Sequence, residues 1–123
     1  MREIKFRGQD VETKEWYYGG IHQSGKDFDI IDDGGRYNER AVISETVGQY
    51  TGLKDKNDKE IYEGDIVKFN QHMYEGKAEV IFDYGMFVFK EFIPYIAHHL
   101  YMQISDIEVI GNIYENPNLL KEA

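Results

Sequence analysis

Closely spaced carboxylates are the residues of this chain whose types and spacing most directly suggest chemistry. Asp27 and Asp29 alternate with apolar residues, so both carboxylates face one side of a short strand, and Asp32-Asp33 follow. Paired carboxylates can act as general acid and base or can hold Mg²⁺. The same pattern also makes an acidic strand edge that discourages aggregation. We favour the acidic edge and keep a small carboxylate- or cation-dependent hydrolase as an alternative.

Histidines do not complete a recognisable metal site in the sequence. His98 and His99 are adjacent, so in a strand they point to opposite faces. His22 and His72 have no acidic neighbours at a spacing typical of known sites. The acidic run that begins at Asp55 lacks the glycine and glutamate that an EF-hand loop needs at its sixth and twelfth positions. We therefore predict no metal and no cofactor.

Nucleophilic catalysis and phosphate binding find no support in the motifs. Ser24, Ser44 and Ser105 occur outside any Gly-x-Ser-x-Gly context, and the chain contains no cysteine. The glycine pairs lack the Gly-x-Gly-x-x-Gly spacing of a phosphate-binding loop. We assign no catalytic residue, and these patterns favour a binding protein over an enzyme.

The charge balance limits the partners. The chain has 23 acidic and 14 basic residues, a net charge of −9. Nucleic acid and anionic membranes are bound mainly through Lys and Arg, so both are disfavoured. We expect a homo-oligomer or a complex with a host protein, and an acidic mimic that occupies a basic host surface is a further alternative. No apolar run is long enough for a spanning helix, and the lack of cysteine fits a reducing cytoplasm.

Alternating apolar and polar residues and many aromatic side chains predict short β-strands along the chain. We expect an N-terminal hairpin from Glu3–Gly8, with Ile4 and Phe6 on one face, and Trp16–Gly19. A second hairpin is expected over Lys77–Lys90, with inward side chains. Those inward residues are Ala78, Val80 and Phe82. Further strands are expected at Asp27–Ile31, Gly64–Phe69, Tyr101–Ile104 and Ile107–Ile113.

The resulting fold class is mainly β. We predict a small antiparallel, barrel-like C-terminal half over about residues 60–115 and an N-terminal β-hairpin region over about 1–50, in one domain of residues 1–123. Asn116-Pro117 predicts an N-cap followed by a short C-terminal helical turn. Ala41–Ile43 favours a brief strand and Ser44–Thr46 a single helical turn, and the sequence does not decide between them.

The densest run of specific signals is Val47–Val67, where apolar anchors flank a charged turn. Within it Gly48–Asn57 and Glu60–Val67 resemble the hallmark of the YopX family. The opening Arg2–Arg7 and the closing Val109–Pro117 resemble the same family, in the same order. We call the following residues the signature block and predict that they form a scaffold or an interaction surface: Gln49, Tyr50, Thr51, Gly52, Leu53, Asp55, Asn57, Ile61, Tyr62, Glu63, Gly64 and Asp65.

The resemblance implies a mostly β protein of bacteriophage or prophage origin in the bacterial cytoplasm, from a family with no assigned biochemical activity. One departure from the family pattern concerns the turn, which usually reads Lys-Asn-Gly-Lys. Here Asn57 is followed by Asp58. A type I′ turn needs positive φ at both central residues, which glycine adopts freely and aspartate less readily. The departure predicts another turn type or a slightly strained turn.

Overall fold

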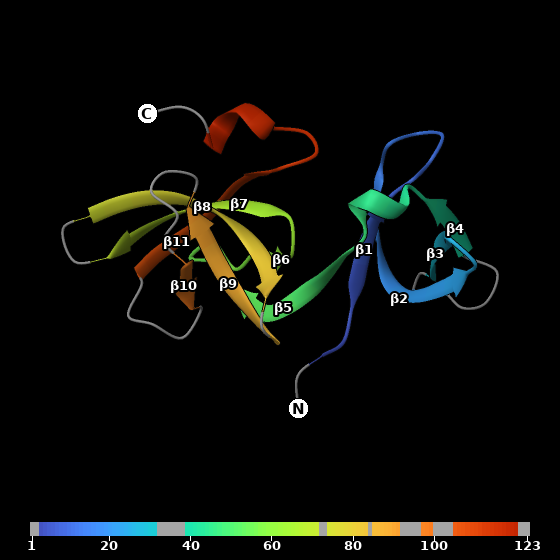
Figure 1. Cartoon of the computed structure of the whole chain (residues 1–123), viewed down its shortest axis with the longest axis horizontal. Helices are drawn as coiled ribbons and strands as arrows, with labels where there is room; N and C mark the ends of the chain where they lie inside the picture. The colour runs from blue at the N-terminus through green and yellow to red at the C-terminus, as the bar shows by residue number, and fades with distance from the viewer. Residues whose placement is uncertain are drawn as a thin grey trace. The chain divides into compact units, whose positions relative to one another are not determined.

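The computed structural model describes residues 3–31, 39–71, 74–83, 85–91, 97–99 and 105–120. These residues form antiparallel strands and two short 3-10 helices, so the expected mainly β class is confirmed (Figure 1). The chain divides into two compact units, Met1–Gly52 and Leu53–Ala123. A single domain over residues 1–123 stays a prediction.

The first unit is an antiparallel sheet with the strand order β4-β3-β2-β1-β5. The hairpin expected at the N-terminus is confirmed by the ladder between β1 and β2, in which Arg7 lies opposite Tyr18. Both readings of residues 41–46 are realised, since a strand is followed directly by a 3-10 helix. The elements are β1 (Phe6–Gln9), β2 (Trp16–Ser24), β3 (Asp27–Ile31), β4 (Glu39–Val42), η1 (Ser44–Thr46) and β5 (Gly48–Lys54). The predicted turn at Asp32-Asp33 lies outside the described residues.

Ile4 and Arg7 depart from the alternation expected of the first strand. Ile4 is 69% exposed because β1 begins only at Phe6. Arg7 is 5% exposed, and its guanidinium lies 4.6 Å from the ring centroid of Trp16. An arginine buries its apolar stem readily, and stacking over an aromatic ring adds a favourable contact. The half-buried strand expected from Glu3 therefore begins only at Phe6, and Arg7, on the face expected to be polar, is buried.

The second unit contains an antiparallel sheet with the strand order β10-β9-β8-β7-β11. The hairpin predicted over Lys77–Lys90 is confirmed by the β8–β9 ladder. Within the described ranges no ladder joins β10 to β11. The predicted strand Tyr101–Ile104 lies outside the described residues. The elements are β6 (Glu60–Tyr62), which adjoins the end of β5, β7 (Asp65–Gln71), β8 (Tyr74–Asp83), β9 (Met86–Glu91), β10 (Ala97–His99), β11 (Ser105–Asn112) and η2 (Pro117–Leu120).

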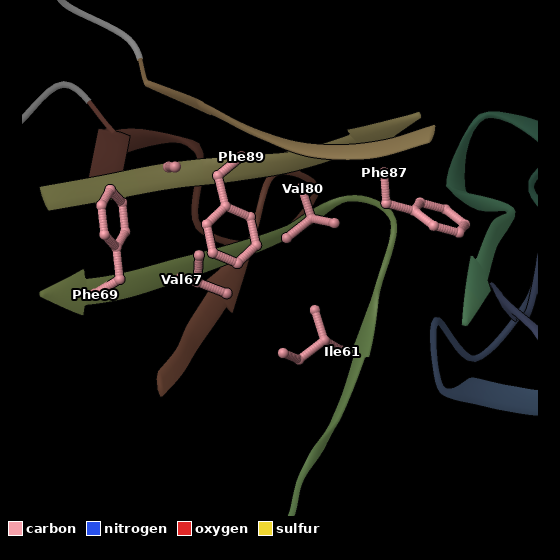
Figure 2. Packing of buried hydrophobic residues seen from close by; sticks show 7 residues of the cluster. Ile61, Val67, Phe69, Val80, Phe87 and Phe89 are labelled. Carbon is pink, nitrogen blue, oxygen red and sulfur yellow. The ribbon is translucent and has the colours of Figure 1, made fainter. Parts of the chain in front are cut away.

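The core of the second unit is a cluster of aliphatic and aromatic side chains between β6 and the sheet (Figure 2). Phe69 and Phe89 contact each other with ring centroids 5.7 Å apart. Leu53, Ile107 and Val109 pack against the cluster from its border. The buried members are Ile61, Val67, Phe69, Ala78, Val80, Phe87 and Phe89.

Phe82 does not behave as the sequence predicted. It is 51% exposed although Ala78 and Val80 on the same face are buried. It lies next to the β8–β9 turn and contacts Phe87 edge-on, at 5.0 Å between ring centroids.

Asn116 directly precedes η2, which is the position predicted for an N-cap, and its carbonyl accepts the Leu119 N–H at 3.1 Å. The Asn116 side chain accepts a hydrogen bond from the Asn112 N–H at 3.2 Å. The short C-terminal helical turn itself is confirmed as η2.

In the described part of the chain, no helix is long and apolar enough to cross a bilayer.

The close approach of Gly8 to Val42 makes a testable prediction about the first unit. A Cβ added at Gly8 would lie 2.8 Å from Cγ2 of Val42, which is closer than packed carbons tolerate. We expect Gly8→Ala to lower the free energy of unfolding by about 1–3 kcal/mol, as overpacking does. Urea denaturation measures this. Gly20→Ala is the control, because a Cβ there meets no atom within 4 Å, and an equal loss in both variants would contradict the prediction.

Candidate functional site

Most of the signature block lies inside the protein. Its fully exposed member is Asn57, and Gln49, Gly52, Leu53 and Glu63 are half-buried. The block occupies β5, the turn that follows, β6 and the start of β7. The buried members are Tyr50, Thr51, Asp55, Ile61, Tyr62, Gly64 and Asp65.

Asp55 links the charged turn to a distant strand. Its Oδ1 accepts hydrogen bonds from the backbone N–H groups of Asn57 at 2.8 Å and Lys59 at 2.9 Å. Its Oδ2 accepts one from the N–H of Val109 in β11 at 2.9 Å, across 54 positions of sequence. The neighbouring Lys56 N–H donates to the Ile107 carbonyl at 2.8 Å. One buried carboxylate therefore holds the turn against β11.

The turn itself accounts for the departure from the family pattern. Asp58 N–H donates to the Asp55 carbonyl at 2.9 Å, and Asp55 N–H donates to the Lys59 carbonyl at 2.8 Å. Asp58 has φ 67°, and it is the residue of the turn with positive φ. This is the three-residue connection in which a β-turn is followed by a left-handed residue. Aspartate tolerates that region better than most residues, so a glycine is not required.

The pKa of Asp55 reflects two opposed effects. Burial disfavours the charged carboxylate and would raise the pKa. Hydrogen bonds from the N–H groups of Val109, Lys59 and Asn57, together with the charge of Lys59, favour the charged form. These contributions outweigh burial, and the pKa of Asp55 lies below its usual range. The carboxylate is thus a stable structural anion.

Gly64 and Asp65 form a second anchor within the block. Oδ2 of Asp65 accepts the Tyr62 N–H at 2.7 Å, which closes the bend between β6 and β7. Gly64 has φ 95°, and a Cβ there would lie 2.9 Å from Cε2 of Tyr114. The Gly64 N–H donates to the Val80 carbonyl at 2.8 Å, and its carbonyl accepts from Ile113 at 2.9 Å. Only glycine combines this backbone with this contact.

A separate group of chemically capable residues lies on the exposed side of β2–β4. His22 is directly opposite Asp29 in the β2–β3 ladder, and Asp29 is opposite Ala41 in β4. Glu39 lies two positions from Ala41 and so faces the same side. We call this side of the sheet the acidic face, and the register places on it Tyr18, Gly20, His22, Asp27, Asp29, Ile31, Glu39 and Ala41.

Three of these side chains converge. Nδ1 of His22 lies 3.4 Å from Oε1 of Glu39 and 3.9 Å from Oδ2 of Asp29. One ligand atom from each of the three residues lies within 4.8 Å of the others. His22 and Glu39 are exposed and Asp29 is half-buried. The group can hold a proton or a cation, and it is open to solvent.

Sequence reasoning missed this convergence although one signal was present. Ser24-Gly25 is a turn-forming pair, and the turn between β2 and β3 pairs Ser24 with Asp27 and so brings His22 opposite Asp29. Glu39 carried no such signal, because its position depends on how the chain returns after Ile31. Asp27, considered together with Asp29, shares the face but is not part of the convergent group. His72 lies outside the described residues.

Comparison with known proteins identifies the family. A family model described as YopX protein matches residues 5–121, nearly the whole chain. The chain belongs to the YopX family. It is also similar to the crystal structure of protein EF1440 from Enterococcus faecalis, at 28% sequence identity and a TM-score of 0.58, over 98% of this chain and 99% of that one. No curated protein matches the chain.

Replacement of the Asp55 carboxylate tests its structural role. We expect Asp55→Asn to lower the free energy of unfolding by about 1–3 kcal/mol. An amide replaces one carboxylate oxygen by an NH₂ group, so it cannot accept all three backbone hydrogen bonds. Urea denaturation followed by far-ultraviolet circular dichroism measures the loss, because the one tryptophan, Trp16, lies in the first unit and Asp55 in the second. Asp58→Asn makes the same change in the same turn, and Asn tolerates positive φ, so its effect should stay within about 0.5 kcal/mol. Equal effects would contradict the assigned role.

The lowered pKa also predicts how stability depends on acid. A carboxyl whose pKa is lower in the folded state stabilises the protein above the pKa of the unfolded chain, about 3.9 for aspartate. That contribution is lost as the pH falls below this value and through the folded pKa. The unfolding free energy of Asp55→Asn should therefore decrease less steeply below about pH 4 than that of the wild type. An equal decrease of the unfolding free energy with falling pH in the two proteins would contradict this prediction. Both proteins still lose some stability in acid through Asp10, whose pKa is also lowered by backbone N–H donors.

Proposed function

We propose that this member of the YopX family is a cytoplasmic protein-binding β module that recognises a basic partner through its acidic face. The observation that supports this most directly is an exposed sheet face that carries several negatively charged carboxylates. Asp27 and Glu39 are exposed on it, and Asp29 is half-buried between them. A surface of one charge steers and selects a partner of the opposite charge.

The register keeps the arginine of β2, β3 and β4 away from the acidic face. Arg40 is the one Lys or Arg residue within these three strands, and it lies opposite Ile30 on the other side. Its guanidinium lies 5.0 Å from the ring centroid of Tyr17, which keeps it on that side. Within these strands, therefore, no Lys or Arg side chain faces the carboxylates, which supports recognition of a basic partner.

An aromatic side chain accompanies the carboxylates. Tyr18 is 43% exposed at the β1 end of the acidic face. Tyrosine contributes a large contact area and loses little conformational entropy on binding, and it is enriched at protein interfaces. A combination of Tyr18 with flanking carboxylates fits a partner that presents Arg or Lys, because guanidinium groups both pair with carboxylates and stack on aromatic rings.

Self-association is the second candidate, and the strand order favours it. β4 lies at the end of the first sheet, where a second copy can add a strand. Against this, the exposed residues Glu39 and Arg40 put charge on that edge, a common way to keep edges apart. Light scattering distinguishes the two candidates, since pairing through β4 requires a dimer in the absence of any other protein.

Matched charge removal tests the basic-partner proposal. The triple variant Asp27→Asn, Asp29→Asn, Glu39→Gln removes three charges from the acidic face. The control Glu12→Gln, Glu45→Gln, Asp58→Asn removes three exposed charges elsewhere. Proteins captured from a bacterial lysate by the wild type, in chelator and low salt, should be bound at least about tenfold more weakly by the first variant. The control variant should bind within about twofold of the wild type.

Salt provides the second condition of the same experiment. Capture through the acidic face should weaken strongly between about 50 and 300 mM salt, because exposed charges are screened. Equal losses in the two triple variants would show that net charge alone holds the captured proteins, and the proposal would fail. Equal capture at the low and the high salt concentration would also contradict the basic-partner proposal.

A further inference from the structure

We propose that His22, Asp29 and Glu39 form a binding site for a divalent transition-metal ion, for which Zn²⁺ is the representative probe. The three residues come from three adjacent strands, β2, β3 and β4. Their ligand atoms already lie within 4.8 Å of one another. This inference goes beyond the basic-partner proposal: the two share Asp29 and Glu39, but the ion would bind the chain in the absence of any partner.

The distances fit a coordination sphere. Zn²⁺ lies about 2.0–2.2 Å from nitrogen and oxygen ligands, so two ligands at a tetrahedral angle are about 3.3 Å apart. Nδ1 of His22 is 3.4 Å from Oε1 of Glu39 and 3.9 Å from Oδ2 of Asp29. The three ligand atoms are at most 4.8 Å apart, so side-chain rotation has to bring them closer by up to about 1.5 Å. An ion at their centre would replace the direct contacts of His22 with the two carboxylates.

The sheet register holds the ligands in place without an ion. His22 and Asp29 are directly opposite each other, and Glu39 is diagonal to Asp29 across the β3–β4 ladder. Directly opposite and diagonal side chains on one face are the pairs that meet in an antiparallel sheet. Three ligands on a hydrogen-bonded sheet lose less freedom on binding than ligands on a mobile loop.

The ligand types select the class of ion. One imidazole with two carboxylates suits Zn²⁺ and the neighbouring first-row ions, whereas Ca²⁺ and Mg²⁺ prefer oxygen ligands alone. Three protein ligands leave at least one coordination position open. Because His22 and Glu39 are exposed, that position faces solvent and can take water or a side chain of another molecule.

The surroundings leave room for the ion. Ala41, opposite Asp29, carries only a methyl group, and the space beside Gly20 is open, since a Cβ there meets no atom within 4 Å. Arg40, the basic residue of these strands, lies over Tyr17 on the other face. Among the described residues, the ion pairs of Asp29 and Glu39 are those with His22. A cation there would meet two carboxylates whose ion pairs, within the described ranges, involve neither Lys nor Arg.

Calorimetric titration of the chelator-treated full chain with Zn²⁺ tests the site. We expect saturable binding of one ion per chain, and His22→Ala, Asp29→Asn and Glu39→Gln should each weaken it by at least about tenfold, since even outer-sphere partners of metal ligands contribute that much. The matched control is Asp27→Asn, which removes the same charge from the same face but no ligand. Its affinity should stay within about threefold of the wild type. His99→Ala controls for loss of an imidazole elsewhere.

A spectroscopic readout distinguishes coordination from loose attraction. In ¹H–¹⁵N spectra optimised for imidazole, Zn²⁺ should shift the His22 ring nitrogens at stoichiometric amounts, and Co²⁺ should give visible absorption that His22→Ala abolishes. Thermal melts of each variant without metal verify that it is folded. Absence of stoichiometric binding to the wild type would overturn the proposal. So would binding that survives His22→Ala, or an equal loss in Asp27→Asn, which would indicate a diffuse counterion only.

Discussion

The Asp55 carboxylate determines much of the second unit's organisation, because a buried charge is tolerated only where donors replace water. Three backbone N–H groups replace it here, two from the charged turn and one from Val109 in β11. The bonds fix the turn after β5 against a strand far along the chain. Seven members of the signature block are buried, whereas the turn around Asp55 exposes Lys54, Lys56, Asn57, Asp58 and Lys59. That the block is a scaffold or an interaction surface stays a prediction.

The surface that we propose for a partner is the acidic face in the first unit. Strand register places Arg40, the one Lys or Arg of β2, β3 and β4, on the opposite side. The carboxylates of the acidic face support both proposals, the basic partner and the divalent cation. The two interactions act over different distances. Electrostatic attraction of a partner depends on all the carboxylates of the face and is screened by salt, whereas metal coordination depends on three ligand atoms close to one another.

Sequence reasoning succeeded where the pattern is local and failed where burial depends on what lies next in space. Alternation correctly located the β1–β2 and β8–β9 hairpins, since register within a hairpin follows from its turn. The same alternation assigned Phe82 to the core, although the end of β8 has too few neighbours to cover it. Asn116 before a proline correctly located the start of the C-terminal turn, because that signal is local as well. Alternation gives the face of a strand and not the depth of its burial.

The β class, the turn positions, the acidic character and the family resemblance were all readable from residue types and short spacings, because each depends on neighbours within a few positions. Tertiary structure alone decided that Asp55 reaches β11, and that His22 and Asp29 meet Glu39. Both outcomes depend on contacts between segments separated by long connections. No local pattern specifies how such connections close, since their geometry is set by the packing of the whole sheet.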